Sequence, residues 1–541
     1  MPGLRLLAIF ATSTIFASVA SALPQYHDPE HSGYPPRPSR YQSDPVASSS
    51  YSVGSSEDSS ASTVAPSNVA TTGYTTFTTS NTAIQVPSYS KLTPTGTAGL
   101  SYGVAQTVSA AVPYATSTPL SSSNTTSNGT VVHPQTFRGV NLGGWLILEE
   151  WMVPGVFNNT GAIDQWTFDS TASNAEARLQ EHWSTYITQQ DFVQMAQWGI
   201  NAVRIPIGYW AFMNASPYIS GADEYLELAI GWARANSMWV MIDLHGLPGS
   251  QNGMEHSGQQ GAVNWQAYDN VNLTLNVLKT IATKYGTMAY QDVVMGIEIV
   301  NEPCKDSSTA GCTNTPTVTQ DFAEQAYDTI RTAAPNQNLW VITHDAWMGA
   351  AQWEGVSANL NNPARFGVDL HLYQNQDAAS RALNVDGQIA AVCSWKQTQF
   401  MGGNATLPIF VGEFAGTIDV CANPDGTTRG GLQCTPSGCQ CTNIPMGNYI
   451  DKSNVVATNL QADLRRFLEA QLETFEQNTN GWFLWSLKGP GLWSAQNIVQ
   501  YIMQGDPLTK RENLNICGHV ILRAYIVSEH QTAEETDVIL V

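Results

Sequence analysis

The sequence predicts an α/β protein whose folded part is a closed (β/α)8 barrel of the TIM type. Eight short apolar runs rich in β-branched residues alternate with amphipathic stretches of helical period, and all of them lie within residues 131–517. Barrels of this kind take ~250 residues or more, so loop insertions are expected. A doubly wound sheet is the alternative, but the chain has neither a G-x-G-x-x-G phosphate loop nor a P-loop lysine motif.

Residues 1–22 have the pattern of a secretory signal peptide. Arg5 precedes the apolar run Leu6–Val19, and Ala20-Ser21-Ala22 forms a cleavage site of the A-x-A kind. The run is shorter than the ~20 residues that a membrane-spanning helix needs. We therefore expect cleavage and export, and an uncleaved N-terminal anchor is the alternative.

Residues 23–130 are predicted to form a disordered stalk. About half of the residues in 41–130 are Ser, Thr or Pro, a composition that cannot bury enough apolar surface to fold and that suits O-glycosylation. A passive spacer is the favoured interpretation, and a cell-wall tether is the alternative. Six N-glycosylation sequons agree with a secreted, extracellular protein: Asn124, Asn128, Asn158, Asn214, Asn272 and Asn404.

The charge balance excludes one class of partner. The chain has 44 Asp and Glu against 23 Lys and Arg, which gives a formal net charge of −21. A polyanion does not bind nucleic acid through a basic surface. Charged residues make up only 12% of the chain, which suits an uncharged substrate. We expect no membrane span after signal cleavage, no metal or cofactor, and a monomer.

The predicted strands follow the apolar runs. They are Arg138–Leu142, Ala202–Ile205, Trp239–Leu244, Val294–Val300, Leu339–Thr343, Phe366–His371, Ile409–Gly412 and Trp482–Ser486. Two helices are predicted most clearly, at Ala222–Asn236 and Gln461–Gln477. The apolar face of the first consists of Tyr225, Leu228, Ala229, Trp232 and Ala233. That of the second consists of Leu464, Phe467, Leu468, Leu472 and Phe475.

All eight cysteines lie between Cys304 and Cys517. In an exported chain an even number of cysteines predicts disulfides. Cys304 and Cys312 could close a short loop after the fourth strand. The four cysteines within 421–441 could in principle bind zinc, but they lack the paired spacing and histidine partners of structural zinc sites, so disulfides are expected there too.

Polar residues gather at the carboxyl ends of the predicted strands, where (β/α)8 barrels carry their active sites. These residues are Arg204, His245, Asn301, Glu302, His371, Tyr373, Glu413 and Trp485. Glu302 and Glu413 each follow an apolar run that fixes the carboxylate at the barrel rim. For a single glutamate, a salt bridge at the rim is the simpler interpretation. For the pair, which has so many polar neighbours, catalysis is the simpler interpretation.

Two facing carboxylates are what cleavage of a glycosidic bond needs, because one donates a proton to the leaving oxygen while the other attacks the sugar or activates water. Asn301, directly before the first glutamate, could hydrogen-bond a sugar hydroxyl. Arg204 beneath Glu413 should keep that carboxylate ionised, and the neighbouring negative charge should raise the pKa of Glu302. We expect the two carboxyl groups to lie about 5–5.5 Å apart, as in retaining enzymes.

Six motifs follow one another along the predicted strands. They are Phe137–Trp145, Val203–Trp210, Asp243–Gly246 with Pro248–Gly253, Asn301–Pro303, Asp369–Gln374 and Gly412–Phe414. In this order they resemble glycoside hydrolase family 5, and within it the fungal exo-β-1,3-glucanases, or glucan 1,3-β-glucosidases. The resemblance covers about residues 135–517.

The resemblance implies a role for each matching residue. Glu302 would be the acid/base and Glu413 the nucleophile of a retaining mechanism, with His371 and Tyr373 beside the nucleophile. The residues implied to bind the terminal glucose are Glu149, Arg204, His245, Asn301 and Trp485. Among these, Glu149 would help to make the pocket blind-ended, and Trp485, more than Trp482, would form a platform for the sugar. A disulfide between Cys393 and Cys517 is also implied.

The chain departs from the family pattern on the leaving-group side. Where the pattern has an aromatic residue followed by Asp-Asn, this chain has Met254, Glu255 and His256, and a second usual aromatic is replaced at Asn375 and Gln376. In the exo-glucanases those two aromatics clamp the sugar that follows the terminal glucose. The resemblance therefore implies release of glucose from the non-reducing end of β-1,3-glucan, with a weakened preference for the next sugar.

Other functions remain as alternatives. A related β-1,6-glucanase or a diglycosidase would use the same two carboxylates. A non-catalytic glucan-binding wall protein would be favoured by loss of either glutamate, and both are present. A serine esterase with His245–Gly249 as its oxyanion loop lacks the G-x-S-x-G motif. Residues 518–541 match no part of the family pattern, and their role is open.

Overall fold

The computed structural model describes residues 132–400, 406–432, 435–442 and 458–519. The predicted signal peptide at 1–22, the stalk at 23–130 and most of the C-terminal tail lie outside the described residues. Within the described part, no helix combines the length and the apolar character that crossing a bilayer requires. Three sequon asparagines fall in this part, and all three are exposed: Asn158, Asn214 and Asn272.

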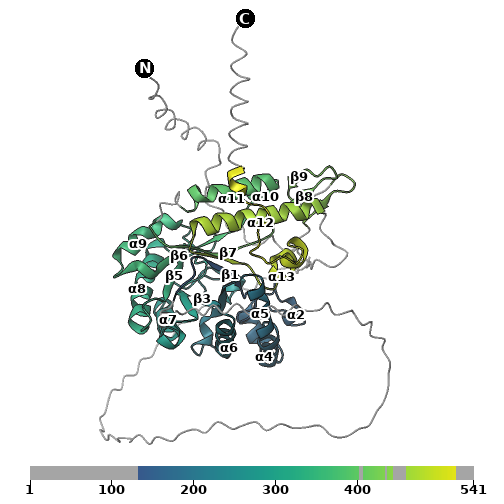
Figure 1. Cartoon of the computed structure of the whole chain (residues 1–541). Helices are drawn as coiled ribbons and strands as arrows, with labels where there is room; N and C mark the ends of the chain where they lie inside the picture. Colours follow the sequence, from purple (N-terminus) through teal and green to yellow (C-terminus); the bar gives the residue numbers. More distant parts are fainter. Residues whose placement is uncertain (1–131, 401–405, 433–434, 443–457, 520–541) are drawn as a thin grey trace, which may run out of the picture. The chain divides into compact units, whose positions relative to one another are not determined.

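The core of the fold is a closed barrel of eight parallel strands in the order β1-β11-β7-β6-β5-β4-β3-β2 (Figure 1). The strands are β1 Phe137–Asn141, β2 Ala202–Gly208, β3 Trp239–Gly246, β4 Val294–Glu298, β5 Trp340–His344, β6 Phe366–Leu372, β7 Ile409–Phe414 and β11 Gly481–Leu484. Each contains or overlaps one predicted run. The predicted (β/α)8 fold is therefore confirmed, and the doubly wound alternative is wrong.

Helices surround the strands (Figure 1). They are α2 Pro154–Phe157, α3 Gln165–Thr171, α4 Ala175–Thr185, α5 Gln189–Gln197, α6 Ala222–Ala235, α7 Asn270–Tyr285, α8 Pro316–Ala333, α9 Glu354–Asn359, α10 Ala378–Arg381, α11 Val385–Thr398, α12 Thr458–Asn478 and α13 Ala495–Asn497. Several begin at capping residues, as when Asn384 accepts a hydrogen bond from Gly387 N at the start of α11.

The two clearest helix predictions differ in outcome. In α12, all five residues of the predicted apolar face are buried. In α6 the bounds are right but the face is partly wrong, because Leu228 is 49% exposed while Leu226 and Ile230 are buried. Trp232 is instead stacked on Trp145, at 6.5 Å between ring centroids, at the edge of the buried stripe. Large aromatic residues at that edge shifted the predicted stripe around the helix.

The barrel interior has an apolar end and a polar end. On β3, side chains two residues apart point to the same side, so Trp239 and Met241 are followed inside the barrel by Asp243 and His245. The apolar layer consists of Phe137, Ala202, Trp239, Met241, Met295, Trp340, Ile342, Phe410 and Phe483. Polar groups at the carboxyl ends of the strands therefore rest on a packed, water-free base.

The insertion after β7 contains a small antiparallel sheet that the sequence analysis did not predict. Its order is β10-β8-β9, from Gln440–Cys441, Val420–Ala422 and Thr428–Gly430. A disulfide joins Cys421 to Cys441, so the zinc alternative does not hold for these two cysteines, while Cys434 lies outside the described residues. The expected disulfides Cys304–Cys312 and Cys393–Cys517 are both present.

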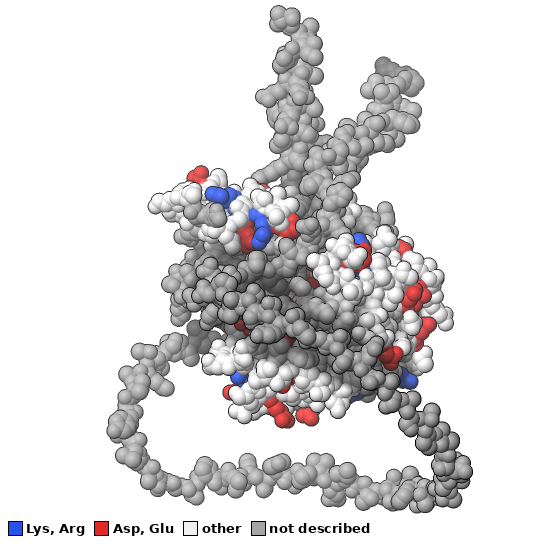
Figure 2. Space-filling model, turned by 180° about the vertical axis from the view of Figure 1, so that it is seen from behind, with Lys and Arg blue, Asp and Glu red and all other residues white. Residues whose placement is uncertain are grey.

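The charge distribution on the surface agrees with the low charge content of the sequence. Figure 2 shows a face on which the described surface is mostly uncharged, with small groups of Asp and Glu and fewer Lys and Arg. This face presents no continuous basic patch among the described residues.

Removing the Cys393–Cys517 disulfide should destabilise the barrel more than removing Cys304–Cys312. The first closes a loop with a sequence separation of 124 residues and the second one of 8. Chain-entropy arguments give roughly 5 kcal/mol for the long loop and about 2.5 kcal/mol for the short one. Urea unfolding of the two double-alanine variants measures this difference. Equal losses of unfolding free energy would contradict the expectation.

Candidate active site

A single buried arginine, Arg204 on β2, lies at the centre of the polar end of the barrel. Its side chain is completely inaccessible to solvent. Its guanidinium contacts five groups: Glu298 at 2.7 Å, Asn301 at 2.8 Å, Asn141 and Glu413 at 3.0 Å each, and Asp243 at 3.1 Å. Four of these contacts are hydrogen bonds, and the contact with Asp243 is an ion pair. Arg204 therefore links strands β1, β2, β3, β4 and β7.

The carboxyl groups around Arg204 cannot all be ionised. Burial raises the pKa of Glu298 well above its usual value, the positive charge of Arg204 opposes this, and the negative charges of Asp369 and Asp243 add to it. One oxygen each of Glu298 and Asp243 is buried without a hydrogen-bond partner. Several acids thus share one fixed positive charge, and burial favours the neutral form of Glu298.

Glu413, at the end of β7, is held through both of its oxygens. Arg204 Nη1 lies 3.0 Å from Oε1, and the hydroxyl of Tyr373 donates a hydrogen bond of 2.8 Å to Oε2. His371 Nδ1 lies 3.4 Å from the same Oε2. The side chain of Glu413 is only 7% exposed. Contacts from β2 and from β6 with its following loop therefore fix the carboxylate in one orientation.

Glu302 lies opposite, in the loop after β4. Its backbone has a φ of 42°, a left-handed conformation that is uncommon for a residue with a side chain and is often found at functional sites. Oε1 lies 2.6 Å from His371 Nδ1, and Oε2 lies 3.4 Å from His256 Nε2. At 17%, its side chain is more exposed than that of Glu413.

His371 contacts both glutamates. Because its Nδ1 lies 2.6 Å from Glu302 Oε1 and 3.4 Å from Glu413 Oε2, these two oxygens can be at most about 6 Å apart. Its Nε2 lies 3.3 Å from Asp369. Burial lowers the pKa of His371, but the carboxylates of Glu413 and Asp369 outweigh burial and raise it well above its usual value.

This imidazole reverses the pKa order that the sequence predicted. Burial raises the pKa of Glu302, but the hydrogen bond and charge of His371 outweigh burial, and the result lies well below the usual value. Burial raises the pKa of Glu413, and the charges of His371 and Arg204 only partly oppose it. The expectation of a raised Glu302 and a lowered Glu413 is therefore wrong for the substrate-free site, because His371 is closer to Glu302.

A second histidine is oriented on the other side of the site. His245 Nδ1 lies 2.6 Å from Asp243, and its Nε2 lies 3.3 Å from the side-chain amide of Asn301. The ring of Trp485 is nearly parallel to the His245 ring, at 16° and 5.9 Å between centroids. Trp482 instead packs on Phe414 outside the barrel, so of the two candidates Trp485 is the one at the site.

Glu149, in the loop after β1, is a buried carboxyl group with one oxygen in use. The indole of Trp151 donates a hydrogen bond of 2.9 Å to Oε2, while Oε1 is buried without a hydrogen-bond partner. Burial and the negative charge of Glu255 raise the pKa of Glu149 well above its usual value, with smaller effects of the same sign from Glu413 and Glu302. Glu149 therefore belongs to the same group of carboxyls.

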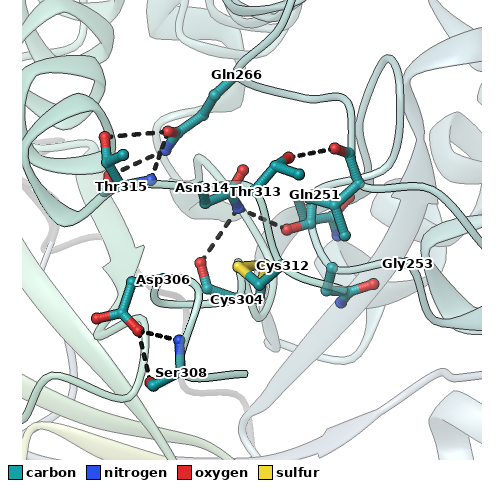
Figure 3. The surroundings of a disulfide bond; sticks show 12 residues. Gln251, Gly253, Gln266, Cys304, Asp306, Ser308, Cys312, Thr313, Asn314 and Thr315 are labelled. Carbon is teal, nitrogen blue, oxygen red and sulfur yellow. Dashed lines mark hydrogen bonds between the residues drawn. A yellow bond between two sulfur atoms is a disulfide. The ribbon is translucent and has the colours of Figure 1, made fainter. Parts of the chain in front are cut away.

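A bonded network fixes the loops that carry Glu302 and His245. Gln251 Nε2 donates to the carbonyl oxygens of His245 at 2.7 Å and Asn301 at 2.8 Å. Figure 3 shows Asn314 beside the Cys304–Cys312 disulfide, donating to the carbonyl oxygens of Gln251 and Cys304. Hydrogen bonds with Gln251 thus link the loop after β4, which the disulfide closes on itself, to the loop after β3.

All nine residues predicted for the site lie at this end of the barrel, but the prediction omitted several of their partners. The omitted residues are Asn141, Asp243, Gln251, His256, Glu298 and Asp369. Asp243 and Asp369 each stand two residues before a predicted histidine, at 245 and 371, on the same side of the strand. The alternation of strand side chains was therefore a usable signal for these two.

Two groups within the described residues have the composition of a metal site. They are Glu302 with His344 and His371, and Glu298 with Asp369 and His371. Both nitrogens of His371 already face carboxylates. His344 Nδ1 accepts a hydrogen bond from Ala346 N, so its neutral form carries the proton on Nε2. These hydrogen bonds are those of a proton-sharing network and leave few lone pairs for an ion.

Comparison with known proteins identifies the family. Residues 168–489, more than half of the chain, match the family model described as cellulase, glycosyl hydrolase family 5. The chain belongs to glycosyl hydrolase family 5. This family 5 protein is therefore a glycosidase, which confirms the resemblance found in its motifs.

Named relatives of this family 5 chain are fungal. It is 36% identical over 397 residues to the probable glucan 1,3-beta-glucosidase A of Aspergillus fumigatus, an alignment that covers 70% of this chain and 90% of that protein. It is 34% identical over 408 residues to the glucan 1,3-beta-glucosidase of Pichia angusta, and that alignment covers 70% of this chain and 88% of that protein. Both similarities support the fungal exo-1,3-glucanase group within the family.

Solved structures support the family 5 fold. The structure of rutinosidase from Aspergillus niger matches with a TM-score of 0.54 and 20% identity, covering 68% of this chain and 96% of that one. The structure named AoRut matches with a TM-score of 0.53 and 22% identity, covering 68% and 95%. At these sequence identities the two structures support the barrel fold alone.

Replacing Arg204 with Met should destabilise the protein by about 3–5 kcal/mol at about pH 7, because it leaves buried acids without a positive partner. Without Arg204 the folded-state pKa of Glu298 and Glu413 rises further. A carboxyl with a raised folded-state pKa loses its stabilising effect as pH rises, so the deficit should shrink at about pH 4. Urea unfolding of both proteins at the two pH values measures it, and a deficit independent of pH would contradict the argument.

Proposed function

We propose that this chain is a secreted, retaining glycosidase that releases glucose from the non-reducing end of β-1,3-glucan, with Glu302 as the acid/base and Glu413 as the nucleophile. The observation that carries the proposal is the pair of carboxylates held within about 6 Å of each other around His371. The relatives named glucan 1,3-beta-glucosidase supply the substrate class. The signal-peptide pattern and the disulfides support export.

In the first half of the reaction, Glu413 attacks the anomeric carbon. Arg204 and the Tyr373 hydroxyl each hold one of its oxygens, so the attacking oxygen is fixed in direction. As the bond from carbon to Glu413 forms, the bond to the glycosidic oxygen breaks. Glu302 gives its proton to that leaving oxygen, and a covalent glucosyl ester remains on Glu413.

In the second half, Glu302 acts as a base. It takes a proton from a water molecule, whose oxygen attacks the anomeric carbon and releases Glu413. The sugar leaves with its original anomeric configuration after two inversions. An inverting enzyme would need its carboxyl groups about 6.5–9.5 Å apart to hold a water between them. Because both Glu302 Oε1 and Glu413 Oε2 contact His371 Nδ1, these two oxygens lie at most about 6 Å apart, which supports the retaining assignment.

His371 supplies the proton that Glu302 needs. In the substrate-free site the charges of His371 and Glu302 form an ion pair at 2.6 Å. A neutral sugar that fills the pocket excludes water, and a charged pair loses more solvation than a neutral pair. With His371 neutral and the proton on Glu302 Oε2, the oxygen that faces away from His371, the site holds a protonated acid beside an ionised nucleophile. Asp369 keeps the ring oriented through Nε2.

The remaining predicted residues divide into two roles. Arg204 is a positioning residue, because its five contacts with protein groups use its donors. His245, Asn301 and Glu149 are the sugar ligands, and the buried, unpartnered Oε1 of Glu149 is an acceptor for a sugar hydroxyl. Trp485, next to His245, provides an apolar face for the ring of the terminal glucose.

A second candidate, a β-1,6-glucanase or diglycosidase, is favoured by the leaving-group side of the site. Met254 is half-buried and Gln376 is exposed, and neither offers an aromatic face to the next sugar. The products from laminarin, β-1,6-glucan and a rutinoside, separated by chromatography, decide between the candidates. Glucose as the single product from laminarin supports the proposal, and release of an intact disaccharide supports a diglycosidase.

Glu413→Ala should abolish turnover of every β-glucoside while the unfolding transition stays near that of the parent. In Glu302→Ala, kcat/KM should fall roughly 10²–10⁴-fold for phenyl β-glucoside, whose leaving group needs general acid catalysis. It should fall far less for 2,4-dinitrophenyl β-glucoside. Azide should restore turnover of the activated substrate by Glu302→Ala, with β-glucosyl azide as product, because retention follows from a covalent intermediate. An α-azide product, or full activity of either variant, would refute these assignments.

The ratio of laminarin to aryl β-glucoside activity should be low in this chain and should rise in the double variant Met254→Phe/Gln376→Phe. Two aromatic faces for the second sugar are worth on the order of 1 kcal/mol each, or up to about tenfold apiece. Steady-state kcat/KM on both substrates measures the ratio. The conservative pair Met254→Leu/Gln376→Asn is the matched control, and an equal ratio in all three proteins would place the determinant elsewhere.

A further inference from the structure

We propose that His256 is a positioning residue for the acid/base Glu302 and that it sets the range of leaving groups and the alkaline limit of activity. This inference rests on the role proposed above for Glu302. His256 is not among the residues matched to the family motifs, since the pattern resembled has an asparagine at this point. The chain therefore places an ionisable ring where that pattern has a neutral amide.

The turn that carries His256 is fixed to the backbone of Glu302. His256 lies in the short 3-10 turn Glu255–Ser257 after β3. Asn252 links the two loops, because its side chain accepts a hydrogen bond from Met254 N at 2.9 Å and donates one to Glu302 O at 3.0 Å. The Ser257 hydroxyl lies 2.7 Å from that of Ser250. These hydrogen bonds thus fix the position of His256 relative to Glu302.

His256 faces the oxygen of Glu302 that is left for the substrate. Oε1 shares a 2.6 Å hydrogen bond with His371, whose side chain is fully buried. Oε2 lies 3.4 Å from His256 Nε2, and the His256 side chain is 8% exposed. Because Oε1 is directed to the interior, Oε2 is the oxygen that meets the glycosidic bond. His256 therefore stands beside the leaving group at the moment of proton transfer.

Other ionisable groups surround His256 and Glu302. From β3, the ring of His245 packs edge-on at 5.5 Å. From its own turn, the carboxyl of Glu255 is largely buried, and burial raises its pKa. On the far side of Glu302 lie His371 and His344, and positive charge on either, like positive charge on His256, favours ionised Glu302. The side chain at position 256 thus influences the pKa of Glu302.

The chemical consequence depends on the leaving group. An acid with a lower pKa gives up its proton more readily, but it stays protonated over a narrower pH range. A leaving group that departs without protonation gains nothing from either effect. A merely structural role for His256 would change the reaction of all substrates alike and would leave the shape of the pH profile as it is.

The test compares the parent with His256→Gln and His256→Asn, and uses His133→Gln as a matched control. His133 is a partly buried histidine that packs edge-on against Trp239 at the apolar end of the barrel, with 4.6 Å between the ring centroids. The measurement is kcat/KM against pH for phenyl and 2,4-dinitrophenyl β-glucoside. In both His256 variants the alkaline limb for the phenyl substrate should move to higher pH. At the pH optimum of the parent, kcat/KM for the phenyl substrate should fall by up to roughly tenfold, the equivalent of one pKa unit. The dinitrophenyl substrate should change less than about twofold, and His133→Gln should keep the parent's profile.

The inference is overturned if the pH profiles of the His256 variants superimpose on that of the parent, or if kcat/KM falls by the same factor for both substrates. The variants Glu302→Ala and Glu302→Ala/His256→Gln separate this failure from failure of the proposed function. Full activity of Glu302→Ala on the phenyl substrate overturns the acid/base assignment itself. If Glu302→Ala behaves as an acid-deficient enzyme but His256→Gln still changes the leaving-group dependence in its background, only the role of His256 is wrong.

Discussion

The polar end of this barrel depends on the burial of one guanidinium. Arg204 brings a permanent positive charge into the barrel interior, where its side chain is fully buried, and the chain surrounds it with five carboxyl and amide oxygens from four other strands or the loops after them. No one contact explains the arrangement. Without the charge, Asp243, Glu298 and Glu413 would be buried acids with no counter-ion, and without the acids the arginine would be buried unpaired. Either change costs several kcal/mol.

The packing beneath this cluster explains why it can stay dry. Trp239, Trp340 and Phe410 pack together at the other end of the barrel interior, beneath the fully buried side chain of Arg204. A low dielectric strengthens every interaction above it. It also makes small changes in distance decisive: His371 is nearer to Glu302 than to Glu413, and that difference is enough to reverse the order in which the two carboxyls hold a proton in the free site.

The sequence was most informative where one strand or one motif decides the outcome. The apolar runs predicted all eight barrel strands, and the abrupt change to Glu302 and Glu413 predicted the two carboxylates, because both signals are local. Asp243 and Asp369 could have been found from the alternation that also places His245 and His371. His256 could not, because its contact with Glu302 depends on how a loop turns after β3. The pKa order needed distances between β4, β6 and β7. The strands β8–β10 have only two or three residues each, which is too short for a periodic pattern to reveal them.

The pairing of β1 with β11 has a consequence for how the protein is made. These two strands close the barrel, and Phe137 pairs with Gly481 across nearly the whole domain. During synthesis Arg204 emerges long before Glu413, and the closing strand emerges later still. The nascent chain therefore cannot complete its charge cluster until almost all of the domain is available. An incomplete barrel would expose the unpaired arginine and the apolar base, and exposed apolar surface makes a partly folded chain prone to aggregation. Catalytic competence and protection from aggregation thus depend on the same closing event.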